Sequence, residues 1–424
     1  MSNTTNDGTS RELKLEGLRD EYRGYQARGL SLDMSRGKPS DEQLHVSMPL
    51  LHSIGPASDC LASDGTDCRN YGVLDGIPEA RRTMAVLLDD EPDNVIVCGN
   101  SSLNIEYDML ARCWMFGTQG AAPWCTLDAV SWLCPVPGYD RHFAITEAFG
   151  IQMIPVPMND DGPDMDLVEE LAAGDPSIKG IWCVPQYSNP SGITYSDETV
   201  RRLAGMECAA EDFRIFWDNA YCVHHLTDDP ASQDHVLDIG VACREAGTPN
   251  RYYKFASTSK ITFPGAGISG LAASSVNIAE TKKRMGVQTI GHNKLNQLAH
   301  AEYLADGLAI ASHMQKHARI IRPKFEAVLR ALAPLRDFGC SWNEPAGGYF
   351  ICFTGPDNTA SRTVELARGA GVVLTQAGAT HPYGRDPHDA VIRIAPTMPP
   401  IEELELAMEV FVCCAKIACI EASA

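Results

Sequence analysis

Chemically reactive side chains follow three short apolar runs of the chain. Lys260 follows residues 252–256, Asp218 and Tyr221 follow residues 213–217, and Asn189 follows residues 180–184. Apolar runs of this length are typical of buried strands, and ligands collect beyond the carboxyl ends of the strands in a parallel sheet. The sequence therefore predicts that an amine, an acid, a phenol and an amide meet at one edge of a sheet.

This set of side chains matches what pyridoxal phosphate requires. The amine of Lys260 can form a Schiff base, Asp218 can keep the pyridine nitrogen protonated, and Tyr221 and Asn189 can bind the ring oxygen. Opposite charges about 4 Å apart attract by roughly 4 kcal/mol at an effective dielectric near 20, enough to move a proton equilibrium by a few pK units. Each residue alone would pass for a turn former or a surface residue, but together they favour the cofactor.

The phosphate of such a cofactor needs donors at the start of a helix. Ser101 and Ser102 stand between a predicted strand and a predicted helix, where backbone N–H groups bind anions. An ordinary helix N-cap would explain the same residues equally well. Ser257, three residues before Lys260, is a further candidate.

Other motifs in the chain point elsewhere and are weaker. Residues 265–270 match G-x-G-x-x-G, but β-prone residues follow, so we predict a tight turn near the lysine and no dinucleotide site. His224 and His225 lack further ligands at metal spacing, and we expect no metal.

The elements around these residues alternate between strand and helix, which predicts an α/β fold with a mostly parallel, seven-stranded sheet covered on both faces. The expected strands are 95–98, 132–134, 151–156, 180–184, 213–217, 252–256 and 268–272. The expected helices among them are 103–116, 140–148, 165–173 and 196–209. Residues 294–332 are predicted to be helical nearly throughout. A smaller α+β part would follow, with strands at 348–353, 372–374 and 391–394 and helices at 361–370 and 401–419.

We expect three regions along the chain. Residues 1–60 form an arm, with a loose tail over the first ten residues and a helix over 11–30 that packs with the small domain. Residues 61–304 form the large cofactor-binding domain, and residues 305–424 form the small C-terminal domain.

Composition excludes several classes of protein. The 35 Lys and Arg against 55 Asp and Glu give a net charge of −20, which disfavours binding to nucleic acid or anionic lipid. The 15 cysteines include no CxxC pair, which is typical of reduced thiols in a cytoplasmic protein. The N-terminus lacks the pattern of a signal peptide. A cytoplasmic location is therefore predicted.

Six motifs together resemble fold-type I pyridoxal-phosphate enzymes of the class I aminotransferase superfamily, and most of all the type Ic (MocR-type) bacterial aspartate aminotransferases. The motifs lie at residues 70–76, 134–143, 188–190, 217–221, 257–262 and 293–300, and the similarity runs from about residue 15 to about residue 415. The resemblance implies a homodimer with active sites shared between subunits.

The resemblance also implies roles for individual residues. Lys260, Asp218 and Tyr221 would be catalytic, and Asn189 would bind both the ring oxygen and the substrate. Six further residues are implied to bind the cofactor: Ser101, Ser102, Tyr139 stacked on the ring, Ser257, Tyr71 from the neighbouring subunit, and Lys294. Lys294 would compensate for an arginine that the family usually has where this chain has Gly267. Those implied to bind the substrate are Arg393 at the α-carboxylate, Gly37 in a closing loop, and Gln288.

The substrate is the open question. Gln288 stands where the family usually has an arginine, and Glu106, Gln186, Tyr187 and Gln376 are more polar than expected near the cofactor. We therefore expect a poor aspartate aminotransferase that prefers a neutral or cationic side chain. Two alternatives stay open for the reaction. The first is elimination or γ-substitution on an amino acid such as S-adenosylmethionine, in specialised metabolism. The second is aspartate transamination proper, with Arg36, Lys294 or Arg284 at the distal carboxylate.

A third class, a transcriptional regulator with an aminotransferase-like domain, would need an appended helix-turn-helix and a basic face. The short acidic N-terminus argues against it.

Overall fold

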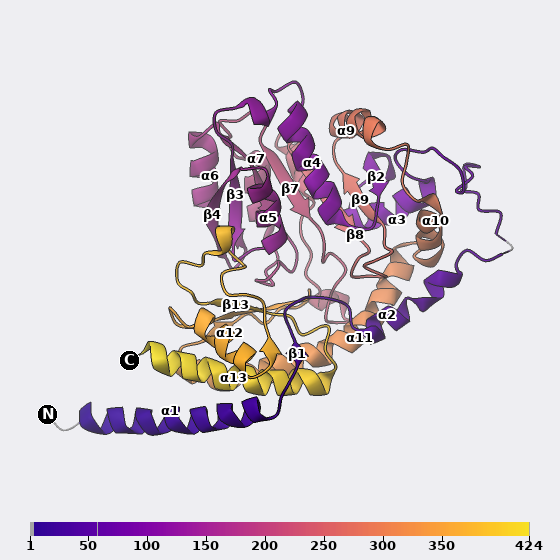
Figure 1. The fold of residues 1–424 in the computed structure, drawn as a ribbon. Helices are drawn as coiled ribbons and strands as arrows, with labels where there is room; N and C mark the ends of the chain where they lie inside the picture. Colours follow the sequence, from indigo (N-terminus) through magenta and orange to yellow (C-terminus); the bar gives the residue numbers. More distant parts are fainter. Residues whose placement is uncertain (1–3, 57, 424) are drawn as a thin grey trace.

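The apolar runs between residues 95 and 272 form one large twisted sheet in the upper half of Figure 1. This computed structural model describes residues 4–56 and 58–423. The sheet order is β2-β9-β8-β7-β6-β3-β4-β5. Its strands are β2 (Val95–Cys98), β3 (Ser131–Val136), β4 (Gln152–Asn159), β5 (Gly162–Pro163), β6 (Ile178–Cys183), β7 (Arg214–Asp218), β8 (Tyr252–Ser257) and β9 (Ser269–Ala272).

The predicted fold class is confirmed, and the sheet has one strand more than predicted. Strands β4, β3, β6, β7 and β8 pair in parallel, whereas β9 runs antiparallel to both β8 and β2. The additional strand is the two-residue β5, which turns back antiparallel along β4. Because β2, β3, β6, β7 and β8 all point the same way, their carboxyl ends meet at one edge of the sheet.

Helices cover both faces of the sheet. They are α3 (Pro78–Leu88), α4 (Ser102–Phe116), α5 (Asp140–Ala148), α6 (Met165–Gly174), α7 (Asp197–Gly205), α8 (Ile239–Glu245), α9 (Ser275–Gln288) and α10 (Lys294–Tyr303). Neighbouring strand residues alternate between the two faces: Trp132 packs with α4 and α5, and Leu133 packs with α6 and α7. Burial on both sides explains why the central strands β3 and β6 are mostly apolar, whereas β4, nearer the sheet edge, alternates between buried and exposed residues.

A smaller α+β part lies below the large sheet in Figure 1. Its elements are α1 (Thr4–Ala27), β1 (Leu32–Asp33), α2 (Asp41–Val46), α11 (Gly307–Leu332), β10 (Ser341–Trp342), β11 (Ile351–Thr354), α12 (Ala360–Gly369), β12 (Val372–Val373), β13 (Val391–Ile394) and α13 (Ile401–Ala422). Strands β10, β11 and β13 form an antiparallel sheet, and β1 pairs in parallel with β12.

Helix α1 (indigo in Figure 1) lies along α13 (yellow), so the two ends of the chain are side by side. The Arg11 guanidinium donates to the Ser423 carbonyl at 2.8 Å, and Arg19 pairs with Glu421 at 3.0 Å. Because α1 begins at Thr4, the predicted loose tail is wrong for residues 4–10. The domain boundaries at residues 60 and 304 remain predictions.

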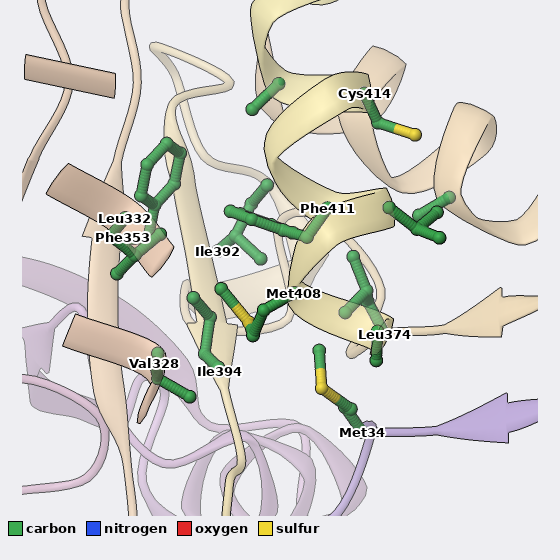
Figure 2. Packing of buried hydrophobic residues seen from close by; sticks show 14 of the residues in the cluster. Met34, Val328, Leu332, Phe353, Leu374, Ile392, Ile394, Met408, Phe411 and Cys414 are labelled. Carbon is green, nitrogen blue, oxygen red and sulfur yellow. The ribbon is translucent and has the colours of Figure 1, made fainter. Parts of the chain in front are cut away.

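The core of the smaller part joins elements that are far apart in the sequence (Figure 2). Its labelled members come from the segment after β1, from α11, from the small sheet and its flanks, and from α13. They are Met34, Val328, Leu332, Phe353, Leu374, Ile392, Ile394, Met408, Phe411 and Cys414. This packing fixes β13, which carries Arg393 toward the large sheet. Across the described ranges, no helix is both long enough and apolar enough to cross a membrane.

Candidate functional site

A cavity of about 450 Å³ opens at the carboxyl edge of the large sheet, facing the smaller part. It is lined by Gly37, Tyr139, Asn189, Tyr221, Lys260 and Arg393, among others. A volume of this size is typical of small-molecule sites. Six of the residues singled out from the sequence therefore meet in one cavity.

Lys260 is placed by the tight turn that follows β8. Its Nζ lies 5.0 Å from the ring centroid of Tyr221. Its own carbonyl accepts a hydrogen bond from the Tyr349 hydroxyl at 3.3 Å and lies 3.3 Å from Nε2 of His224. Burial lowers the pKa of Lys260, against the opposing effect of the Asp218 carboxylate. More of the lysine is then the neutral amine, which is the form that attacks a carbonyl or accepts a proton.

Asp218 is the last residue of β7, and only 4% of it is exposed. Its Oδ2 lies 3.3 Å from Nε2 of His142, whereas Oδ1 has no hydrogen-bond partner within the described ranges. An unpartnered buried carboxylate oxygen is costly unless a donor completes it. The protonated nitrogen of a pyridine ring is such a donor, so this residue fits pyridoxal phosphate.

The start of α4 fits the phosphate of that cofactor. Ser101 is the N-cap residue, and in the described part of the chain its side chain makes no capping hydrogen bond, so it is available to a ligand together with the first N–H groups of the helix. Ser257 ends β8, which β9 separates from β2 in the sheet, and its hydroxyl donates to Ser259 at 3.0 Å. Ser259 in turn donates to the Asn100 carbonyl at 2.9 Å, which ties the two segments together.

Arg393 enters the cavity from the smaller part. Its Nη1 donates to Oδ1 of Asp140 at 2.8 Å and to Oδ1 of Asn189 at 3.3 Å, and its guanidinium lies 4.9 Å from the ring centroid of Phe350. Gly37 lies against the same ring, where a Cβ would collide with it. The glycine thus allows the 35–38 loop to approach Phe350, and Phe350 in turn supports the arginine.

Tyr139 caps the start of α5 and lines the cavity, and its ring lies edge-on to His142 at 4.9 Å. Burial raises the pKa of the Tyr139 and Tyr221 phenols well above their usual range, with a further rise from nearby negative groups. Both side chains therefore remain hydrogen-bond donors at neutral pH.

Seven of the predicted site residues are not among those that line this cavity: Asp218, Ser101, Ser102, Ser257, Lys294, Gln288 and Tyr71. Lys294 is buried and donates to the carbonyls of Asn70 and Gly72 at 2.6 and 2.9 Å, so it holds the loop before Tyr71 instead of facing a ligand. Gln288 ends α9 and accepts from Arg112 at 2.8 Å. Tyr71 is 84% exposed.

Of the four polar residues that the sequence suggested near the cofactor, one lines the cavity and three do not. Gln376 lines the cavity. Gln186 donates to the Asp234 carbonyl at 2.8 Å, and the Tyr187 hydroxyl bonds to His225 at 2.7 Å, so both serve the surrounding structure. Glu106 does not line the cavity; it is fully buried on α4, with its Oε2 3.3 Å from Nε2 of His142.

Arg284, considered for a distal carboxylate, lies over the Phe116 ring at 4.4 Å and is not among the residues that line the cavity. Arg36, considered for the same role, does line it.

Several residues to which the sequence analysis gave no role are brought to the site by the fold, among them Asp140 and Phe350 beside Arg393. His142, Arg141 and Lys38 all stand in motifs that were noticed, but no role was assigned to them. Arg141 and Lys38 line the cavity, and His142 contacts Asp218 behind it. A histidine three residues after Tyr139, in the first turn of a helix, was the available signal.

Comparisons with known proteins agree with this geometry. Residues 7–424 match the family described as "Aspartate amino-transferase". The chain is 46% identical over 409 residues to an aspartate aminotransferase of Corynebacterium glutamicum, covering 96% of this chain and 94% of the relative. It is 47% identical over 405 residues to a Mycolicibacterium smegmatis protein described as a presumed aminotransferase, covering 95% and 94%. The crystal structure of a C. glutamicum aspartate transaminase superimposes with a TM-score of 0.95 at 46% identity, covering 99% of this chain and 98% of that one.

Proposed function

Because the chain belongs to the aspartate aminotransferase family and is a pyridoxal-phosphate-dependent transferase, we propose that it transaminates an acidic amino acid, with aspartate as the first candidate. The observation that carries this proposal is the charge of the cavity. Besides Lys260, four basic side chains line it, Arg36, Lys38, Arg141 and Arg393, against the carboxylate of Asp140, which already pairs with Arg393. The remaining positive charge favours a substrate with a second carboxylate.

This proposal replaces the expectation of a poor aspartate aminotransferase. That expectation depended on Glu106 repelling a second carboxylate and on Gln288 standing in for an arginine. Glu106 is buried behind the cavity, and Gln288 pairs with Arg112 and Asp108. The elimination alternative has no support from the relatives named above.

We propose that the residues of the cavity bind the cofactor and substrate and move one proton. Bound pyridoxal phosphate supplies an aldehyde that condenses with amines and a ring that accepts the electron pair released at the substrate α-carbon. Lys260 would hold the cofactor through its Nζ, and the same amine would accept and return the proton at the substrate α-carbon. Asp218 would keep the proton on the ring nitrogen, and Tyr139, which lines the cavity, would contact the ring. Arg393 binds the α-carboxylate as a two-pronged pair.

We also propose that the chain belongs to the type Ic subgroup. The resemblance to class I aminotransferases outside that subgroup implies an arginine where this chain has Gly267. A Cβ there would lie 2.7 Å from Oγ1 of Thr258, and Asn296 donates to the Gly267 carbonyl at 2.8 Å. The turn is therefore closed to a larger side chain.

The proposed assembly is a homodimer. An exposed aromatic ring such as that of Tyr71 suits an interface. A groove of about 560 Å³ runs beside the start of α4, lined by Leu51, Asn100 and Asn296 among others. We propose that the partner subunit's Tyr71 enters this groove and reaches the phosphate. Cytoplasmic location and a place in specialised metabolism remain predictions from the sequence.

The test is a comparison of substrates. Purified protein loaded with pyridoxal phosphate is mixed separately with aspartate, glutamate, alanine, lysine, phenylalanine and S-adenosylmethionine, with a keto acid as amino acceptor. We expect aspartate or glutamate to give the highest kcat/KM. Replacing Arg36, Lys38 or Arg141 singly by glutamine should reduce the preference for aspartate over alanine in at least one variant. A preference for lysine or S-adenosylmethionine would refute the proposal.

A further inference from the structure

A second buried carboxylate lies behind the acid that faces the cofactor. Glu106 is on the first turns of α4, and its exposed fraction is 0%. Neither of its oxygens has an aligned hydrogen-bond partner among the residues that the structure describes. Burying a carboxylate in this way is costly unless a charge of opposite sign lies close by.

That opposite charge is the imidazole of His142. Its Nε2 lies 3.3 Å from Oε2 of Glu106 and 3.3 Å from Oδ2 of Asp218. The imidazole is fixed in place because it stacks on Trp182, with the centroids 4.3 Å apart and the planes 8° from parallel. The Trp182 indole in turn donates to the Thr146 hydroxyl at 2.8 Å. The histidine therefore sits between two carboxylates and is held there by the packing of β6 and α5.

We propose that Glu106 is a positioning residue that keeps His142 as an imidazolium, so that the Asp218 carboxylate remains free to hold the proton of the cofactor's ring nitrogen. Two carboxylates and one imidazolium leave one negative charge to pair with the protonated ring. Without the charge of Glu106, His142 and the ring nitrogen would compete for the single carboxylate of Asp218. The proposal rests on the cofactor site and is independent of which amino acid is the substrate.

The pKa values of Glu106 and His142 depend on the ionisable groups around them. Those that act on Glu106 are His142, Tyr139, Asp218 and Lys260. Burial lowers the pKa of His142, but the two carboxylates outweigh it and raise that pKa to about 9. Burial and then the Asp218 carboxylate raise the pKa of Glu106 to about 7, against the effects of His142 and Lys260. The charge of Glu106 is therefore present above neutral pH and is lost below it.

The same three side chains could suit a metal ion, because their ligand atoms lie within 4.8 Å of one another. A metal would occupy the carboxylate that faces the ring, so the two uses exclude each other. The metal content of the purified protein distinguishes them, and one equivalent of bound metal would overturn the proposal.

The experiment compares Glu106→Gln, which removes the charge, with Glu106→Asp, which retains it. Asp108→Asn is the matched control, since it removes a carboxylate from the same helix that faces Arg112 and Gln288. The first readout is the His142 titration midpoint in the cofactor-free protein, followed by NMR with ¹⁵N-histidine. We expect the midpoint to fall by about one pH unit or more in Glu106→Gln, which is a tenfold change in proton affinity. Glu106→Asp should recover part of this shift, and Asp108→Asn should leave it unchanged.

The second readout is the dissociation constant of pyridoxal phosphate at two pH values. At pH 8, Glu106→Gln should weaken binding by about tenfold and alter the absorbance of the bound cofactor. At pH 6, where Glu106 of the natural protein already holds a proton, the variant and the natural protein should converge. A loss of affinity that is equal at both pH values, or an unchanged His142 midpoint, would show that Glu106 has only a packing role and would overturn the proposal.

Discussion

Replacing Arg393 by alanine should abolish efficient turnover while leaving the cofactor bound. The arginine is 7% exposed, and it is oriented from three sides by Asp140, Asn189 and the ring of Phe350. Its Nε has no partner among the described residues, so part of the fork is free to receive a carboxylate. We therefore expect the substrate α-carboxylate to be bound from that side.

The size of the effect follows from this geometry. Removing one partner of a buried charge pair costs about 3–5 kcal/mol. In the variant the substrate carboxylate is the group left without its cation, and because it enters an open cavity that water also reaches, we take the lower end of that range. About 3 kcal/mol corresponds to a loss of roughly 100-fold or more in kcat/KM. Arg393→Lys retains the charge but not the two-pronged geometry and should lose about tenfold.

The assay measures kcat/KM for aspartate together with the absorbance of the bound cofactor. Arg330→Ala is a suitable control, because that arginine lies on α11 at the surface and pairs loosely with Glu405, at 3.9 Å. Its kcat/KM should match that of the natural protein. If Arg393→Ala retains kcat/KM within about threefold, the arginine does not bind the substrate and the assignment fails.

Three further predictions concern neighbouring groups. Asp218→Ala should still bind pyridoxal phosphate but lose most of its turnover, because a neutral ring is a poor electron sink; turnover near that of the natural protein would contradict the role. Gly37→Val should raise KM at least several-fold, because the new side chain collides with Phe350 beneath the arginine; an unchanged KM would show that the loop does not reach the substrate. The cofactor-free protein should lose stability as pH rises, because the folded-state pKa values of Glu106 (about 7, against 4.5) and His142 (about 9, against 6.5) are both raised. Each contribution is complete below the unfolded pKa and is lost as pH rises through the folded one, and urea denaturation from pH 5 to 9 should show a flatter profile for Glu106→Gln.

The sequence predicted those parts of the fold that local pattern controls. Helix α5 and strands β2 and β13 have the predicted bounds, because each has a clear period or an apolar run with a distinct boundary. Helix α7 was predicted to extend to residue 209 but ends at Gly205. There the Arg251 guanidinium donates to the carbonyls of Ala204 and Met206 at 3.0 and 2.8 Å. Because the residue that caps this helix lies 45 positions further along the chain, the sequence near residue 205 does not show that the helix ends there.

A similar limit applies to the long helix predicted over residues 294–332. The structure divides it into α10 and α11, because Asp306 accepts from the Ala309 N–H at 2.8 Å and starts a new helix. An aspartate before a helix is an N-cap signal, but it is weaker than the continuous helical pattern on either side.

For the candidate site too, some residues could be placed from the sequence and others could not. Lys260, Asp218 and Asn189 could be predicted to meet, because residues at the carboxyl ends of parallel strands share one edge. The placements of Glu106 and Gln288 could not be predicted, because each depends on the direction in which a helix presents a side chain to a distant partner.

The most direct test of the whole account is to locate the lysine that carries the cofactor. The protein is loaded with pyridoxal phosphate, reduced with borohydride and digested, and the labelled peptide is identified by mass spectrometry. The account predicts label on Lys260 alone, and a folded Lys260→Ala variant that takes up no covalent label and has no transaminase activity. Label on another lysine, or activity that survives in Lys260→Ala, would contradict it.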